Sequence, residues 1–368
     1  MQVKDLVRAM ETLAPTHLKE DWDNVGLQIG GPEDQVQHVL LALTPSEKVV
    51  EEAIERGCDM IITHHPFIFK GVKTLRTDTV IGRMSQACIK HDIALYCAHT
   101  NLDIAQGGVN DVLAARLGLE HIRGLQKTAE TPRYKVVVFV PTSHVESVKV
   151  AMFQAGAGAQ GDYESCAWSV VGSGQFVPKM GANPYLGEIG KVETVEEARL
   201  EVLVDRIHLH AVIEAMCCAH PYEEVAYDVF VNEGSVSRAY LGRVGDLPVP
   251  MRMADWLSDV KQALNIPVVS VAGDTERMVK TVALCGGSAC DLLGDAKYAG
   301  ADVYVTGDMK YHDAQRAVEM DMAMVDVSHY GGERPVLVAL QSYLLETFTE
   351  GLRVDISEKE ENFINYIK

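Results

Sequence analysis

The sequence lacks the features that mark membrane-spanning, secreted and thiol-redox proteins. No apolar run approaches the roughly 20 residues that a membrane-spanning helix needs, and the first residues have no apolar stretch of the signal-peptide kind. The eight cysteines form no C-x-x-C pair, so neither a thioredoxin-type motif nor a zinc knuckle is indicated. Several of them lie among apolar residues, as buried free thiols do. We therefore expect a cytoplasmic protein with reduced cysteines.

Positive charge is also scarce. The 368 residues include 33 Lys and Arg against 52 Asp and Glu, which gives a formal net charge of −19. This balance argues against general electrostatic binding to nucleic acid or to an anionic membrane, but it leaves room for a local basic pocket. The hydrophobic fraction of 47% is ordinary for a globular protein, and the length is sufficient for two domains.

Strand and helix patterns alternate at both ends of the chain. Apolar runs typical of strands are followed by helical spacing of apolar residues at 38–56, 60–90 and 93–117, and this rhythm returns after residue 253. It predicts an α/β main domain with a mostly parallel sheet covered by helices. The middle segment has a β-α-β order on either side of a Gly-rich stretch at 156–190, which predicts an inserted ferredoxin-like α+β domain. We place the main domain at 1–126 and 242–368, and the insert at 127–241.

Two adjacent histidines, His64 and His65, follow the apolar strand expected at 60–63 and precede Pro66. Neighbouring side chains on a strand point to opposite faces, so both imidazoles can serve one site only if the chain bends there. The carboxyl end of a strand is where ligands bind in open α/β sheets. A surface pair beside a turn is the alternative, and the motif alone would favour it.

Three more expected strands end in polar residues, and together with the histidine pair they suggest one site. Because the carboxyl ends of parallel strands meet at one edge of a sheet, residues far apart in sequence can converge there. The convergent set is His64, His65, Asp103, His329 and Glu333. Imidazole and carboxylate donors suit zinc, iron or manganese. Five donors exceed the three that a single catalytic zinc normally uses, so we predict two divalent ions per subunit, with zinc favoured, bridged by a carboxylate.

Each of these residues also has a structural explanation. Asp103 fits an Asx-turn, and Glu333 fits a favourable charge at the N-terminus of the helix expected after Pro335. His99 fits a core histidine or a residue that orients a ligand, and we leave it outside the direct ligands. Asp308 and His312 fit an orienting, a substrate-binding or a structural role equally well. Only the convergence of four strand ends favours the metal site.

Two further motifs leave alternatives open. Gly286-Gly287-Ser288 follows an expected strand and fits either a phosphate cradle or a tight turn, so Gly287 and Ser288 are candidates for substrate contacts. Trp22 fits either the rim of a site or a structural position beneath a loop, and we favour the latter. No Ser/His/Asp or Cys/His nucleophile arrangement is legible.

These motifs resemble the Nif-three-like family, whose bacterial members are called GTP cyclohydrolase 1 type 2 homologs. The residues that carry the resemblance lie in both halves of the main domain, at 22–27, 64–66, 99–103, 306–308 and 329–333. The segment His220-Pro221-Tyr222-Glu223-Glu224-Val225-Ala226-Tyr227 looks like the inserted domain of the longer members, which is similar to P-II and CutA proteins.

The resemblance implies a dinuclear metal site with the five convergent residues at ligand positions and Glu333 as the bridge. It also implies a toroidal homohexamer, a dimer of trimers. One departure is Gly331-Gly332, where the family leads us to expect a bulkier pair, but the spacing from His329 to Glu333 is kept.

Together the motifs and the resemblance predict a metal-dependent hydrolase that acts on a nucleotide or another phosphate-bearing small molecule. A GTP cyclohydrolase, for example, opens the imidazole ring of a purine with a metal-activated hydroxide. His99 or Asp308 would then carry the proton. The alternative is a metal-binding scaffold or regulator without turnover, in which the insert senses a small molecule or holds the oligomer.

Overall fold

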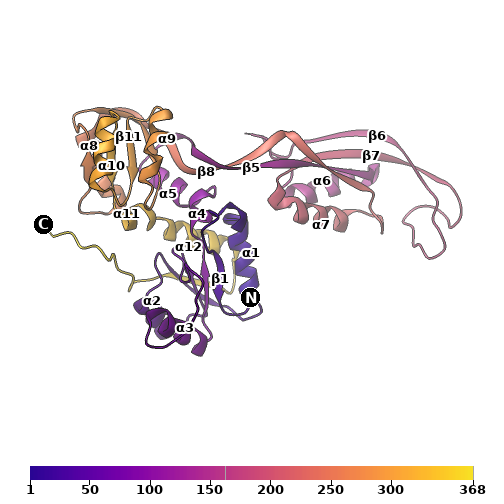
Figure 1. Ribbon diagram of the computed structural model, residues 1–368. Helices are drawn as coiled ribbons and strands as arrows, with labels where there is room; N and C mark the ends of the chain where they lie inside the picture. The colour runs from indigo at the N-terminus through magenta and orange to yellow at the C-terminus, as the bar shows by residue number, and fades with distance from the viewer. Residues whose placement is uncertain (162, 368) are drawn as a thin grey trace. The chain divides into compact units, whose positions relative to one another are not determined.

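A computed structural model describes residues 1–161 and 163–367. The chain divides into two compact units: unit 1 comprises Met1–Ala129 and Ala239–Lys368, and unit 2 comprises Glu130–Arg238. Two long strands, β5 (Glu120–Pro141) and β8 (Tyr227–Arg252), run from one unit into the other (Figure 1). Each buried hydrophobic cluster takes all its members from a single unit, so each unit has a core of its own.

The first sheet of unit 1 has the strand order β1-β4-β3-β2-β13. Its strands are β1 (Gly26–Ile29), β2 (His38–Ala42), β3 (Met60–Thr63), β4 (Ala94–Cys97) and β13 (Arg353–Ile356). All neighbours are parallel except β1 and β4. The central strands are apolar on both faces because helices cover both: α1 (Val3–Leu13) and α12 (Val336–Thr347) on one, α2 (Glu47–Arg56) and α3 (Val80–Lys90) on the other.

The second sheet of unit 1 contains, in order, β8, β10 (Met278–Leu284), β11 (Val303–Thr306), β12 (Ala323–Asp326) and β9 (Ser270–Ala272). The three central strands are parallel, and β8 and β9 are antiparallel to them. Helices α5 (Val109–Arg116) and α8 (Met253–Leu264) cover one face, and α9 (Leu293–Tyr298) and α10 (Tyr311–Glu319) the other. The predicted α/β class is confirmed, but the expectation of one continuous sheet is wrong.

Helix ends in unit 1 follow from local capping. The Ser46 hydroxyl accepts a hydrogen bond from the Val49 N–H at the start of α2, and Gly57 ends this helix with a left-handed φ of 64°. The short helical segments are η1 (Thr16–Leu18), α4 (Thr100–Ile104), η4 (Cys290–Leu292) and α11 (His329–Glu333). Across the described residues, no helix has the length and apolar character needed to cross a membrane.

Unit 2 is a layer of strands packed against two helices. Its strands are β6 (Ala167–Phe176), β7 (Glu193–Val204) and parts of β5 and β8, in the order β6-β7-β5-β8. The helical segments are η2 (Thr142–His144), α6 (Val145–Gln154), η3 (Arg206–His208) and α7 (Leu209–Ala219). The Gly-rich stretch contains β6, which is exposed along nearly all its length although it includes Trp168, Val170 and Val171. The ferredoxin-like, P-II/CutA-like assignment of the insert stays a prediction.

We predict that unit 1 folds without unit 2. Glu130 and Arg238, the first and last residues of unit 2, form an ion pair of 3.2 Å, so the two ends of the excised segment lie side by side. Replacing Glu130–Arg238 with a short Gly/Ser linker should leave a soluble protein with the helical circular dichroism and the metal content of unit 1. An insoluble product, or a folded product that binds no metal, would show that unit 1 depends on the insert.

Candidate metal centre

The residues expected to bind metal come from both sheets of unit 1. His64 and His65 follow β3, and Asp103 lies in α4 just after β4. His329 and Glu333 lie on α11, which follows β12 of the second sheet. The two residues are four positions apart on one helical turn, so their side chains lie on the same face of α11.

All five residues lie together in overlapping groups whose donor atoms are within 4.8 Å of one another. One group is His64, Asp103 and Glu333, and a second is His65, His329 and Glu333. Glu333 belongs to both: its Oε1 lies 3.5 Å from Nε2 of His64, and its Oε2 lies 3.0 Å from Nε2 of His65 and 3.3 Å from Nε2 of His329. The two oxygens of one carboxylate thus face different histidines.

The orientation of each imidazole is set through its Nδ1 atom. Nδ1 of His64 donates to the Ala98 carbonyl, and Nδ1 of His329 donates to Oδ2 of Asp308, both at 2.8 Å. Nδ1 of His65 shares a hydrogen bond of 2.8 Å with the Thr44 hydroxyl. The Nε2 atoms are therefore left to face the carboxylates, which is how metal-binding histidines are normally held.

Two buried atoms at the centre have no hydrogen-bond partner among the described residues. They are Nε2 of His64 and Oδ1 of Asp103, and their separation of 3.6 Å is too long for a hydrogen bond. Leaving buried polar atoms unpaired is costly. A cation between them would satisfy both, so this donor set fits a metal ion.

The five side chains shift one another's pKa values. Burial disfavours a charged His64, but Asp103 and Glu333 outweigh this effect and raise its pKa to about 9. Burial likewise opposes a charged His329, yet Glu333 and Asp308 raise its pKa to about 9. Burial would raise the pKa of Glu333, but the histidines hold it well below its usual range. The carboxylates thus hold protons on two histidines, and a metal ion that binds there must displace them.

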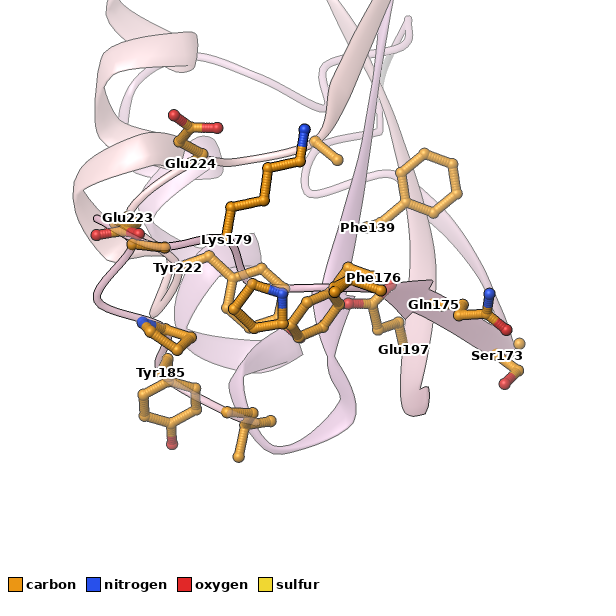
Figure 2. A pocket seen from close by; sticks show the side chains of 18 of the residues that line it. Phe139, Ser173, Gln175, Phe176, Lys179, Tyr185, Glu197, Tyr222, Glu223 and Glu224 are labelled. Atoms are coloured by element: carbon orange, nitrogen blue, oxygen red, sulfur yellow. The ribbon is translucent and has the colours of Figure 1, made fainter. Parts of the chain in front are cut away.

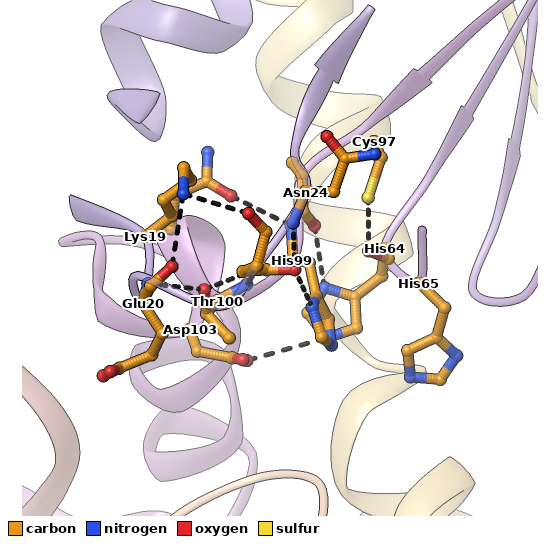
Figure 3. A network of polar contacts seen from close by, with 12 residues as sticks. Lys19, Glu20, Asn24, His64, His65, Cys97, His99, Thr100 and Asp103 are labelled. Carbon is orange, nitrogen blue, oxygen red and sulfur yellow. Dashed lines mark hydrogen bonds and ion pairs between the residues drawn. The ribbon is translucent and has the colours of Figure 1, made fainter. Parts of the chain in front are cut away.

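His99 has the same arrangement as the other three histidines. Its Nδ1 donates to Oδ1 of Asp23 at 2.9 Å, and its ring belongs to a third group of potential donors with His64 and His65. Asp23 also accepts hydrogen bonds from the backbone N–H and the hydroxyl of Thr100. Figure 3 shows His99, Thr100 and Asp103 beside the histidine pair. The structure therefore places His99 close enough to act as a ligand or to exchange protons at the site.

Asp23 should stabilise the fold in a pH-dependent way. Burial tends to raise its pKa, but the bonds from His99 and Thr100 lower it from 3.8 to about 2. A carboxyl with a depressed pKa stabilises the folded state above its unfolded pKa, and the effect is lost as pH falls towards 2. We expect Asp23→Asn to cost about 2 kcal/mol at pH 7 and roughly half as much near pH 3.

Urea unfolding of the wild type and Asp23→Asn at both pH values measures this difference. Asp21→Asn is a matched control, because it removes the same charge from an exposed position two residues away. A stability gap that does not narrow between pH 7 and pH 3 would contradict the assigned role of the Asp23 charge.

Nearly the whole chain is similar to known proteins. A family model described as Duf34/NIF3 (NGG1p interacting factor 3) matches residues 1–362. The chain belongs to the Duf34/NIF3 family. The resemblance inferred from the motifs is confirmed.

Individual relatives agree with this membership. A Bacillus subtilis (strain 168) protein named GTP cyclohydrolase 1 type 2 homolog is 43% identical over 327 residues, covering 89% of this chain and 88% of that protein. A Bacillus cereus protein related to NIF3 has a crystal structure with a TM-score of 0.88 and 39% identity, covering 100% of this chain and 99% of that one. The Staphylococcus aureus protein SA1388 gives a TM-score of 0.72 at 31% identity, with coverage of 100% and 99%.

Other predicted site residues of this Duf34/NIF3 chain lie in different surroundings. Asp308 bonds to His329 and so orients a potential ligand. Gly287 lies against Glu333, where a Cβ atom would come within 2.5 Å of Oε1, whereas Ser288 is exposed. His312 is exposed on α10 and contacts Gln315. Gly331, part of the unexpected Gly pair, has no room for a side chain, because a Cβ atom there would lie 2.8 Å from Ile266.

Sequence reasoning missed Thr44 and Glu360 and considered Asp23 only as a carboxylate beside Trp22. Glu360 accepts hydrogen bonds from the backbone N–H groups of Leu43 and Thr44, and Thr44 in turn bonds to His65. The carboxylate of Glu360 thus fixes the end of β2 from a position 316 residues away from Thr44. The sequence could have indicated Thr44, which follows the end of β2, and Asp23, which precedes the start of β1. No comparable pattern marks Glu360.

Proposed function

We propose that this protein is a metal-dependent hydrolase with a dinuclear centre that acts on a nucleotide or another phosphate-bearing small molecule. The observation that carries the proposal is the position of Glu333, whose two oxygens face separate groups of donors. One ion would be held by His64, Asp103 and Glu333, and the other by His65, His329 and Glu333. Three donors for each ion leave coordination positions for water and substrate.

The donor types support zinc first, with iron or manganese as alternatives, because imidazoles outnumber carboxylates. Bound in pairs, such ions lower the pKa of a water molecule and supply hydroxide near neutral pH. The chain's own residues hold the donors in place through Ala98, Thr44 and Asp308. His99, held by Asp23, is positioned to accept or donate a proton beside the histidine pair.

The exposure of the cluster also favours turnover over storage. The side chain of His64 is fully buried, whereas that of His329 is 33% exposed. The second group of donors therefore borders solvent, from which a small molecule can approach. A site that binds metals only for structure would normally be closed on all sides.

Metal analysis combined with a substrate screen tests the proposal. Purified protein is reconstituted with zinc, iron or manganese, and nucleotides and phosphoesters are screened for hydrolysis by chromatography and phosphate release. We expect two ions per chain and hydrolysis of at least one compound, with both lost in His64→Ala. One ion per chain would contradict the dinuclear centre, and full occupancy without any hydrolysis would favour a scaffold.

The second candidate function, small-molecule sensing by the insert, is favoured by a cavity of about 1170 Å³ in unit 2. Its wall combines aromatic rings with charged groups: Phe139, Phe176, Tyr185, Tyr222, Lys179, Glu197, Glu223 and Glu224 (Figure 2). Arg199 also lines it. The Tyr222 hydroxyl donates to Glu197 at 2.8 Å, which fixes this ring in the wall. A mixed aromatic and polar lining is typical of sites for small organic ligands.

A thermal-shift screen with mononucleotides and amino acids tests this second function. A ligand of the cavity should raise the melting temperature of the wild type and of Glu333→Gln, but not that of Tyr222→Ala. A ligand whose effect survives Tyr222→Ala binds elsewhere, and the absence of any stabilising compound would count against sensing by unit 2.

Self-association is part of the same proposal. Five apolar residues of β6 and β8 are exposed: Trp168, Val170, Val171, Phe230 and Val231. The adjacent pairs Val170-Val171 and Phe230-Val231 point to opposite faces of their strands, so both faces carry exposed apolar side chains. Apolar surface of this kind is normally covered by a partner. A homohexamer, a dimer of trimers, would use it. Light scattering should then give a particle of six times the chain mass.

A further inference from the structure

Two large aromatic side chains are exposed beside the metal centre in unit 1. Trp22 is 58% exposed and Phe69 is 46% exposed, and their ring centroids lie 5.8 Å apart. The Trp22 ring also lies edge-on to His99 at 6.0 Å. The expectation that Trp22 lies beneath a loop is therefore wrong. A single exposed aromatic residue is unremarkable, but a contacting pair next to potential metal ligands calls for an explanation.

Hydrogen bonds join the two segments that carry the pair. The side-chain amide of Asn24 donates to the carbonyl of Ile68, and the Ile68 N–H donates to Oε1 of Gln28 at 2.8 Å. The amide of Gln28 donates in turn to the Asn24 carbonyl at 2.8 Å. These hydrogen bonds fix the segment that contains Trp22 to the loop that contains Phe69. These bonds present the two rings in a defined arrangement, which lowers the cost of ligand binding.

Unpaired positive charge follows directly after Phe69. Lys70 and Lys73 are exposed, and neither forms an ion pair with any described residue. Aromatic faces with nearby lysines suit a planar ring that carries an anionic group.

We propose that Trp22 and Phe69 form a stacking platform for the base of a nucleotide, with Lys70 and Lys73 attracting its phosphate. The base would then lie next to His99, whose ring centroid is 5.2 Å from that of His64 and 5.8 Å from that of His65. The platform therefore selects substrates with a heteroaromatic ring and holds the ring beside the metal ligands. The inference rests on the proposed hydrolase for its role in turnover, but not for binding itself.

Calorimetric titration of the full chain with GMP, AMP, CMP and UMP tests the platform. Stacking tolerates different bases, so the wild type should bind more than one of the four. Trp22→Ala should weaken binding by about 5- to 100-fold, and Phe69→Ala should weaken it in the same direction. Trp22→Phe keeps an aromatic face and should retain most of the affinity. Tyr298→Ala removes another exposed aromatic ring of unit 1 and should change nothing.

The outcomes separate this inference from the proposed hydrolase. If the wild type binds none of the four nucleotides, or if Trp22→Ala binds them unchanged, the platform is wrong whatever the metal content. If Tyr222→Ala rather than Trp22→Ala abolishes binding, the nucleotide occupies the cavity of unit 2. Inorganic phosphate alone should bind far more weakly than GMP, and equal affinity would assign binding to the lysines alone. Failure to hydrolyse any compound, with Trp22-dependent binding intact, would refute the hydrolase and leave the platform standing.

Discussion

Glu333→Gln is expected to lose at least one metal ion per chain and all hydrolase activity while the fold remains. Glutamine keeps the volume and one carbonyl oxygen, but it removes the charge that faces His64, His65 and His329. In a two-metal site the ions are only about 3.5–4 Å apart, and a bridging carboxylate offsets their repulsion. Metal analysis and circular dichroism of the purified variant measure both parts of the prediction.

Asp103→Asn is the natural comparison, because Asp103 belongs to only one group of donors. It should weaken one ion and leave the other in place. If Glu333 merely caps the helix that follows, Glu333→Gln would cost about 0.3–1 kcal/mol of stability and leave the metal content unchanged. Equal metal-to-protein ratios in the wild type and Glu333→Gln would therefore overturn the bridging role.

Gly287→Ala should also empty the site, although Gly287 itself donates nothing to a metal. A Cβ atom at this position would lie 2.5 Å from Oε1 of Glu333, so the carboxylate must move away from His64. Glu333 is buried and held by three histidines, and it has little room to move without losing one of them. We expect a loss of metal comparable to that in Glu333→Gln, measured in the same way.

Gly118→Ala is a closely matched control. Both glycines have a φ of +68°, so alanine costs about 1–2 kcal/mol of backbone strain at either position. At Gly118, however, a Cβ atom would meet no described atom within 4 Å. Both variants should lose similar stability, and only Gly287→Ala should lose metal. Loss of metal in both would mean that strain, and not the contact with Glu333, disturbs the site.

The sequence by itself determined the secondary-structure rhythm of unit 1 and indicated the five candidate donor residues. Helices such as α2 and α12 were predictable because apolar spacing and capping residues act over a few positions. The candidate donors were predictable because they lie at or shortly after the ends of apolar strands, as with His64 directly after β3 and His329 three residues after β12. The exposed strand β6 escaped this reasoning, because its glycines, Gly172 and Gly174, favour a loop over a strand.

Only the tertiary structure decided how these pieces meet. The donors come from two sheets, and their packing brings Glu333 between His64 and His65, which precede it by 269 and 268 residues. The partners that orient the histidines, among them Thr44, Asp23 and Asp308, lie 21 to 76 positions away from them. Hydrogen bonds over such separations depend on the path of the whole chain, which no local pattern of residues encodes. The exposure of Trp22 and its contact with Phe69, 47 residues later in the chain, likewise depend on the tertiary structure.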